Sequence, residues 1–209
     1  MRMAARELLR RPRSFVVPLA ILCLLGLLQL YPSAILDGIT LDSTAAVRNA
    51  PADLVVYSSN ANGVQLRSRV EPAVRKQVEA VPGVAGVASF DLTVLSGKLA
   101  NGVAVPLAVL ASDTPFAESV SGPSILPAPG EAVADVSLQT WSGFTVGTEL
   151  ELGPLKTPVK IIAFAPGTNL FFAGGLVVNK ATWLTALGGQ NVDPAQAAAG
   201  PTQALLVKT

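Results

Sequence analysis

The chain has 209 residues, enough for one sizeable domain with an appendage, and half of them are apolar while only 14% are charged. Soluble domains usually carry about 25% charged residues, so part of this chain is expected to face something other than water. The absence of histidine removes the commonest general base and metal ligand. A single cysteine allows neither an internal disulfide nor a thiolate zinc site, and a net charge of +1 gives no electrostatic case for binding nucleic acid.

Charge is unevenly distributed along the chain. The first 14 residues hold five arginines and one acid, a net charge of +4, whereas the remainder holds 10 basic and 13 acidic residues, a net charge of −3. The five arginines are Arg2, Arg6, Arg10, Arg11 and Arg13. By the positive-inside rule, this basic segment, 1–14, is predicted to be cytoplasmic and its arginines to determine the membrane topology.

A transmembrane helix is predicted for 15–36, which contains 22 residues and no charged side chain. At about 1.5 Å per residue it would be about 33 Å long, enough for a hydrocarbon core of about 30 Å. The alternative is a cleaved signal peptide, whose apolar region is shorter and ends at a small-x-small cleavage site. Because Pro32 disfavours cleavage at the end of the apolar run, we expect an uncleaved anchor in the lipid bilayer, with residues after about 40 extracytoplasmic.

After a polar connector at 37–50, the residues 51–209 are predicted to form an extracytoplasmic core domain. Its first part, 51–113, contains a β-rich run, then valines spaced as one face of a helix, then two extended runs. The β-rich run is 53–58, the valines are Val70, Val74, Val78 and Val81, and the extended runs are 84–95 and 103–110. This order predicts an α+β unit.

Short runs with strand character, separated by glycine and proline, continue through 114–190 and predict a small inserted β-rich subdomain. The runs are 131–135, 141–146, 148–152, 159–164 and 176–179. A loop is expected at 193–201, and 203–209 is predicted to begin a returning strand of a longer chain. The predicted fold class is therefore α+β, with one N-terminal transmembrane helix, an extracytoplasmic α+β domain and the inserted subdomain.

No motif for catalysis or cofactor binding occurs in the sequence. A Walker A sequence is absent, as are GxGxxG, GxSxG and HExxH. The carboxylate pairs at 131 and 135 and at 149 and 151 fit solvated strand ends better than a cation site. We therefore expect no catalytic residue, no cofactor and no metal. A membrane-anchored enzyme is disfavoured because no nucleophile is paired with a base, and the chain is predicted not to be an enzyme.

Aromatic residues are concentrated at 167–175, where Phe171 and Phe172 are adjacent. Neighbouring side chains on a strand point to opposite faces, so one of the two rings would be exposed and would contact a partner or lipid. The alternative is that both rings are buried beneath a glycine-rich loop.

The order of these features resembles the beginning of MacB/FtsX-type ABC-transporter permeases, of the DevC-like branch. The resemblance is carried by RELLRRPRSF before the apolar run, PADLVVYS after it, VEPAVRKQVEAVPGVAGV, and GEAVADVSLQTWSGFTVGTELEL followed by VKIIAFA. It covers nearly the whole chain, rests on pattern and order, and includes no invariant catalytic signature.

The resemblance implies a permease subunit in the bacterial plasma (inner) membrane, with a cytoplasmic ABC ATPase subunit as partner, a homodimer of the permease and a periplasmic adaptor protein. It also implies export of a lipid-like or amphipathic compound, with ATP hydrolysis coupled to movement of the extracytoplasmic domain. Such permeases have three further membrane helices, and no second apolar run of about 18 residues follows residue 36, so an N-terminal fragment is expected. The alternative is a stand-alone single-pass membrane-anchored binding or adaptor protein.

Overall fold

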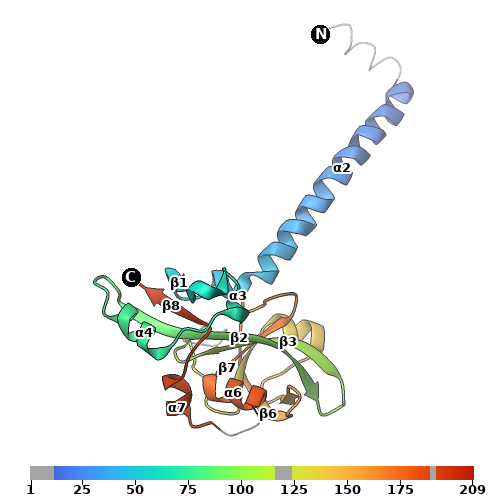
Figure 1. The fold of residues 1–209 in the computed structure, drawn as a ribbon. Helices are drawn as coiled ribbons and strands as arrows, with labels where there is room; N and C mark the ends of the chain where they lie inside the picture. Colours follow the sequence, from blue (N-terminus) through green and yellow to red (C-terminus); the bar gives the residue numbers. More distant parts are fainter. Residues whose placement is uncertain (1–11, 116–123, 189–191) are drawn as a thin grey trace. The chain divides into compact units, whose positions relative to one another are not determined.

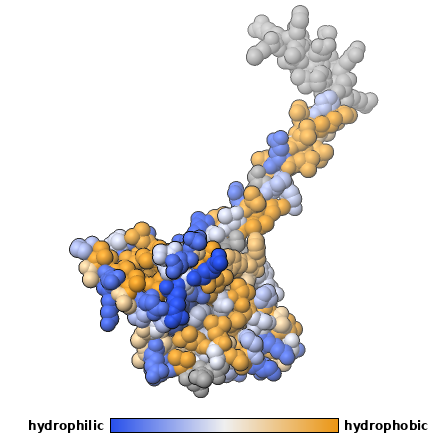
Figure 2. Space-filling view, viewed as in Figure 1, coloured by the Kyte–Doolittle hydropathy of each residue, from blue (hydrophilic) through white to orange (hydrophobic). Residues whose placement is uncertain are grey.

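The structure, a computed structural model, describes residues 12–115, 124–188 and 192–209. The chain divides into two units, Met1–Leu41 and Asp42–Thr209. Helix α2 (Pro12–Ser43) accounts for the described part of the first unit (Figure 1). Its stretch Val16–Leu41, 26 residues, is long and apolar enough to cross a membrane by length and composition. Figure 2 shows apolar side chains along most of this helix.

The helix extends beyond the predicted span of 15–36. It continues through 37–43, the first half of the segment expected to be a polar connector, and the short helix α3 (Ala45–Arg48) follows. Apolar residues recur in this segment, and the Thr40 hydroxyl donates a hydrogen bond to the carbonyl of Leu36, one turn earlier, at 2.8 Å. The polar residues of 37–43 therefore do not interrupt the helix.

Residues 42–209 form a mixed α+β unit on one sheet, which has eight strands in the described part of the chain (Figure 1). The strands are β1 (Leu54–Val56), β2 (Gly86–Leu99), β3 (Ala104–Ser112), β4 (Glu131–Asp135), β5 (Glu149–Leu152), β6 (Thr157–Ala165), β7 (Gly174–Asn179) and β8 (Ala204–Lys208). Their order is β1-β8-β2-β3-β7-β4-β6-β5, and β2 also pairs with β5. That additional pairing closes the strands from β2 to β5 into a ring, from which β8 and β1 extend.

Side chains alternate between the inside and the outside of this ring, as the two-residue period of a strand requires. The inside is filled by one apolar cluster, and β5 shows the direction because Leu150 and Leu152 are buried while Glu149 and Glu151 are exposed. The other strands contribute Leu107, Val109, Ala111, Ala132, Ala134, Val159, Ile161, Leu176 and Val178. A second cluster on the outside includes Phe90, Leu92, Leu110, Val177, Leu206 and, from α3, Ala46. A barrel-like core thus stabilises the ring, and α3 packs on its outer side.

Helices and short 3-10 turns cover the remaining surfaces. They are η1 (Ser59–Ala61), η2 (Gln65–Arg67), α4 (Pro72–Glu79), α5 (Ser137–Ser142), α6 (Lys180–Gly188) and α7 (Pro194–Ala199). The valine-spaced helix predicted from the sequence is α4, and Val78 packs against Val70 and the buried side of β8.

The α+β class and the N-terminal apolar helix are confirmed, and most predicted strand runs form strands. One prediction was wrong: 141–146 lies at the end of α5 and in the turn after it, where Gly143 has a φ of 67°. The expected loop at 193–201 contains α7, which begins because the Asp193 carboxylate accepts hydrogen bonds from the N–H groups of Ala195 and Gln196 at 2.8 and 3.3 Å. Helix α6 had no counterpart among the predicted elements.

The segment 114–190 is rich in strands, as expected, but its strands share the sheet of the flanking segments. They join it through the parallel pair β3–β7 and through the pairing of β2 with β5. Close approach at the second junction depends on Gly97, where a Cβ would lie against the side chains of Leu107 and Leu150. Strand β8 lies between β1 and β2.

Candidate functional site

A tight turn at Leu170–Ala173 projects from the connection between β6 and β7. The Leu170 N–H donates to the Ala173 carbonyl at 3.2 Å, and the Ala173 N–H donates to the Leu170 carbonyl at 2.9 Å. The central residues, Phe171 and Phe172, have φ angles of 51° and 61°. Positive φ at both central positions is typical of a type I′ turn, which strongly favours Asn-Gly.

The aromatic pair is both strained and exposed. A residue other than glycine with positive φ costs about 1–2 kcal/mol, and bulky residues rarely adopt it. Phe171 is 53% exposed and Phe172 is 66% exposed, whereas the flanking Leu170 and Ala173 are buried. The structure therefore places both rings at the surface, where the sequence analysis expected one or neither, because they occupy a turn and not a strand. Their role as a contact for a partner or lipid stays a prediction.

Buried polar side chains hold the base of this turn. The Asp135 carboxylate, at the end of β4, accepts hydrogen bonds from the Thr168 N–H and hydroxyl at 2.8 and 3.0 Å and from the Ser137 N–H at 2.9 Å. The Asn169 carbonyl oxygen accepts from the Ser137 hydroxyl at 3.1 Å and from the Gly175 N–H at 3.2 Å. The loop therefore presents the two rings from a fixed base.

The same loop is bonded to the segment that follows α2. The N–H of Ala46, in α3, donates to the Asn169 carbonyl at 3.0 Å, and the Asn49 amide donates to the Gly167 carbonyl at 3.1 Å. Ala46 is fully buried. The start of the extracytoplasmic unit and the aromatic turn are thus parts of one packed region.

A groove of about 390 Å³ lies beside the turn. Its apolar wall includes Val47, Val64, Leu66, Leu92, Leu170 and Phe171. Arg48, Tyr57 and Gln65 add polar groups, and burial raises the pKa of the Tyr57 hydroxyl above 10.0. Within the described part of the chain, the buried amide nitrogen of Gln65 has no hydrogen-bond partner. The groove thus suits an amphipathic surface better than a small polar substrate.

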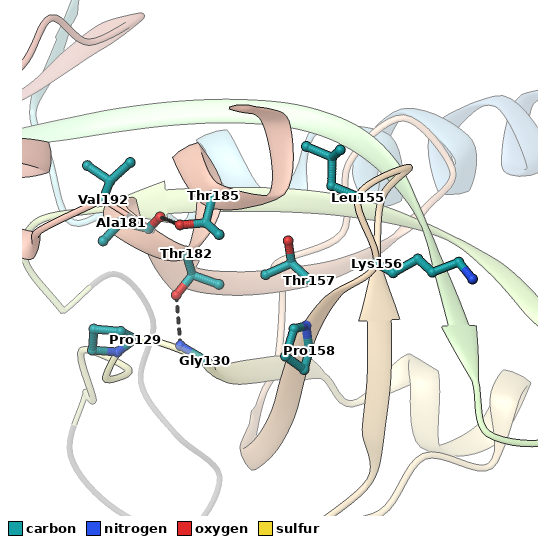
Figure 3. Close-up of a pocket in the computed structure, with 10 residues that line it drawn as sticks. All are labelled: Pro129, Gly130, Leu155, Lys156, Thr157, Pro158, Ala181, Thr182, Thr185 and Val192. Atoms are coloured by element: carbon teal, nitrogen blue, oxygen red, sulfur yellow. Dashed lines mark hydrogen bonds between the residues drawn. The ribbon is translucent and has the colours of Figure 1, made fainter. Parts of the chain in front are cut away.

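A second cavity, of about 490 Å³, lies between α6 and the β5–β6 hairpin (Figure 3). Its threonine hydroxyls bond to backbone groups, since Thr182 accepts from the Gly130 N–H at 3.0 Å and Thr185 donates to the Ala181 carbonyl at 2.9 Å. In Figure 3 the Lys156 side chain points away from these threonines. Among the described residues that line this cavity, no nucleophile is paired with a base.

The described residues also contain no group of three or more cysteine, aspartate or glutamate side chains that could hold a metal ion. The carboxylate pair at 131 and 135 is divided between two tasks, because Glu131 accepts from the Ala128 N–H at 3.2 Å whereas Asp135 holds the base of the aromatic turn. Of the predicted topology-determining residues, Arg13 lies in the first turn of α2. Arg2, Arg6, Arg10 and Arg11 lie outside the described residues.

Sequence reasoning missed a buried ion pair on the other side of β2. Lys180 Nζ, at the start of α6, lies 3.6 Å from Asp91 Oδ2, and their side chains are 3% and 2% exposed. Lys180 also donates to the carbonyls of Gly200 and Pro201 at 3.3 and 3.0 Å. Burial raises the pKa of the Asp91 carboxyl and Lys180 opposes that effect. The available signal was a single charge within an apolar strand run, SFDLTVL.

Asp91 also connects the chain segment before β8 to β2. Its carboxylate accepts from the Thr202 hydroxyl at 2.9 Å and from the Gln203 N–H at 2.7 Å. The pair therefore joins β2, α6 and the α7–β8 connection, a structural arrangement with no exposed reactive group.

No protein-family model matches the chain. No curated protein sequence matches it either. Solved structures do match: the extracellular domain of the noncanonic ABC-type transporter YknZ from Gram-positive bacteria is similar with a TM-score of 0.50 and 12% identity, covering 74% of this chain and 81% of that one. The periplasmic region of MacB from Actinobacillus actinomycetemcomitans gives a TM-score of 0.48 and 11% identity, covering 74% and 72%. A domain of a Porphyromonas gingivalis protein described as a permease gives 0.43 and 18%, covering 67% of each chain.

At these identities the similarity defines the fold. The domain formed by 42–209 has the fold of an extracellular domain of an ABC-type transporter, and it follows an apolar helix in the same chain. The predicted resemblance to MacB/FtsX-type permeases is thereby confirmed at the level of fold.

Proposed function

We propose that this chain belongs to the membrane permease subunit of an ABC transporter that exports a lipid-like or amphipathic compound. The observation that carries the proposal is the presence, in one chain, of an apolar helix of membrane-spanning length and the fold of the YknZ extracellular domain. In this function a cytoplasmic ATPase partner hydrolyses ATP, and the extracytoplasmic domain moves in response. The domain would respond to a ligand only through different affinities for its two positions.

The segment between the helix and the domain is suited to transmitting such motion. The chain leaves α2 at Ser43 and enters α3, whose Ala46 is buried in the outer apolar cluster and hydrogen-bonded to Asn169. A displacement of α3 would therefore reach the Leu170–Ala173 turn and the outer side of the ring without passing through a flexible linker.

Orientation, assembly and location form part of the proposal. The five N-terminal arginines support a cytoplasmic N-terminus in a bacterial plasma membrane, with the domain outside. The resemblance to MacB/FtsX-type permeases supports a homodimer and a periplasmic adaptor as further partners.

Sequencing the gene and its transcript beyond codon 209 tests the proposal. We expect an uninterrupted reading frame that encodes three further apolar spans, together with co-purification of an ABC ATPase when the complete product is isolated from its own membranes. A stop codon at this position, with no ATPase retained, would instead support the stand-alone single-pass membrane-anchored binding or adaptor protein.

A further inference from the structure

The aromatic turn is the place where exposure, backbone strain and position in the chain coincide. Phe171 and Phe172 expose most of their rings while both have positive φ, although Asn-Gly would form the same turn without strain. The backbone bonds of the turn do not require aromatic side chains. The retention of two phenylalanines therefore indicates a role for the rings outside the domain itself.

The covalent chain keeps this turn close to the end of the membrane-spanning stretch. Thr44 lines the same groove as Phe171, and it follows Leu41, the last residue of that stretch, by three positions. Three residues span at most about 11 Å at any angle between the two units. The headgroup region on one side of a bilayer is about 5–8 Å thick. The groove must therefore lie at or near the membrane surface when α2 spans the bilayer.

The neighbours of the turn have the chemistry of an interfacial surface. Val64 and Leu66, on the same groove, are 43% and 54% exposed, so the apolar area extends beyond the two rings. Arg48 lies on this groove and is exposed. An arginine beside exposed apolar side chains matches the border between acyl chains and anionic headgroups.

We propose that the Leu170–Ala173 turn inserts Phe171 and Phe172 into the outer surface of the membrane, with Arg48 facing lipid phosphate groups. The turn then fixes the base of the extracytoplasmic domain on the bilayer. This inference requires α2 to span a membrane, and it does not require the proposed transport activity.

The test uses the full chain reconstituted in phosphatidylcholine vesicles with Cys23→Ser as background. An environment-sensitive NBD label is attached at Phe172→Cys and, as the matched control, at Val146→Cys, since Val146 is an apolar residue of similar exposure (64% against 66%) elsewhere on the domain. We expect blue-shifted emission at 172 and several-fold stronger quenching there by nitroxide-labelled lipids. Equal quenching at the two positions would overturn the proposal.

Two further measurements separate membrane contact from other causes. Protection of position 172 that persists in detergent and depends on protein concentration would mean contact with a second copy, and would also overturn the proposal. The variant Phe171→Asn/Phe172→Gly should unfold no more easily than the parent in detergent, because it relieves the strain. A clear loss of stability would show that the rings serve the fold. Arg48→Gln should reduce the additional quenching gained when phosphatidylglycerol is included, and an unchanged gain would remove Arg48 from the proposal.

Discussion

Replacing Lys180 with methionine, which has a similar length and no charge, would remove one half of the buried ion pair. In the structure Lys180 Nζ lies 3.6 Å from Asp91 Oδ2 and donates to two backbone carbonyls before β8. The variant leaves the Asp91 carboxylate with the Thr202 hydroxyl and the Gln203 N–H as donors. A buried negative charge then lacks its counter-charge, and two carbonyls lack their donor.

Removing one partner of a buried ion pair costs about 3–5 kcal/mol. Both side chains are nearly inaccessible, so solvent does not screen the effect, and we expect a loss of that size from a total unfolding free energy of about 5–15 kcal/mol. The double variant Asp91→Leu/Lys180→Met should recover most of the loss, because it leaves no unpaired charge. Lys208→Met is the matched control. Lys208 lies 3.4 Å from Asp53 with side chains 59% and 41% exposed, so its replacement should change stability little.

The assay is urea unfolding of the full chain in detergent micelles, followed by tryptophan fluorescence. Trp183 is 7% exposed and lies three residues after Lys180, so it reports on the affected region. Trp141 is 62% exposed and is replaced by phenylalanine in every variant to isolate the signal of Trp183. A loss in Lys180→Met no larger than the loss in Lys208→Met would refute the reasoning.

The pH dependence of this loss has a defined sign. Burial raises the pKa of Asp91 above 3.8 and Lys180 opposes the rise, so removing Lys180 raises that pKa further. A carboxyl whose pKa is raised by folding stabilises the native state fully below 3.8 and loses this contribution as the pH rises through its folded-state pKa. Lys180→Met should therefore be less destabilising under acid conditions than at neutral pH. The double variant, which lacks the carboxyl, should not show this trend.

Three further predictions concern the loop and the topology. Gly175→Ala should lower the unfolding free energy by about 1–3 kcal/mol, because its Cβ would overlap the Thr168 carbonyl, whereas Gly86→Ala, with open space around it, should be tolerated; equal urea midpoints would contradict this. Asp135→Ala should cost about 1–3 kcal/mol for each buried donor left unpaired, and a stability equal to that of the parent would show that the loop does not need these bonds. A cysteine at the exposed β2–β3 hairpin, Ala100→Cys with no other cysteine, should react with an impermeant maleimide on intact cells; reaction only after permeabilisation would reverse the proposed orientation.

The sequence predicts local elements here better than it predicts their pairing. Alternating apolar residues located strands such as Glu149–Leu152 and Gly174–Asn179, because a two-residue period is a local property. The pairing of Gly97–Leu99 with β5 and the position of β8 between β1 and β2 depend on contacts between distant segments, which no period reveals. The segment 114–190 therefore resembled a separate subdomain in sequence although its strands share one sheet.

Tertiary context also explains the error at 141–146. Aromatic and β-branched residues in this run favour a strand, yet strand propensity mainly reflects fit to a half-buried pleated surface. In the structure Phe144 is buried inside the ring while Trp141 is exposed, and the backbone reverses at Gly143 between them. The burial of Phe144 by the other strands decides the conformation of this segment.

Two features of the domain depart from ordinary preferences, and they call for different explanations. The buried pair of Lys180 and Asp91 is accounted for within the fold, since its hydrogen bonds join β2, α6 and the segment before β8. The strained rings of Phe171 and Phe172 have no such explanation, because Asp135 and Asn169 hold the base of the turn whatever its two central side chains are. Exposed aromatic rings in left-handed backbone weaken the isolated domain, and the site of this cost is a few residues from the end of the membrane-spanning stretch. The stabilising contact that offsets it is therefore best sought in the bilayer.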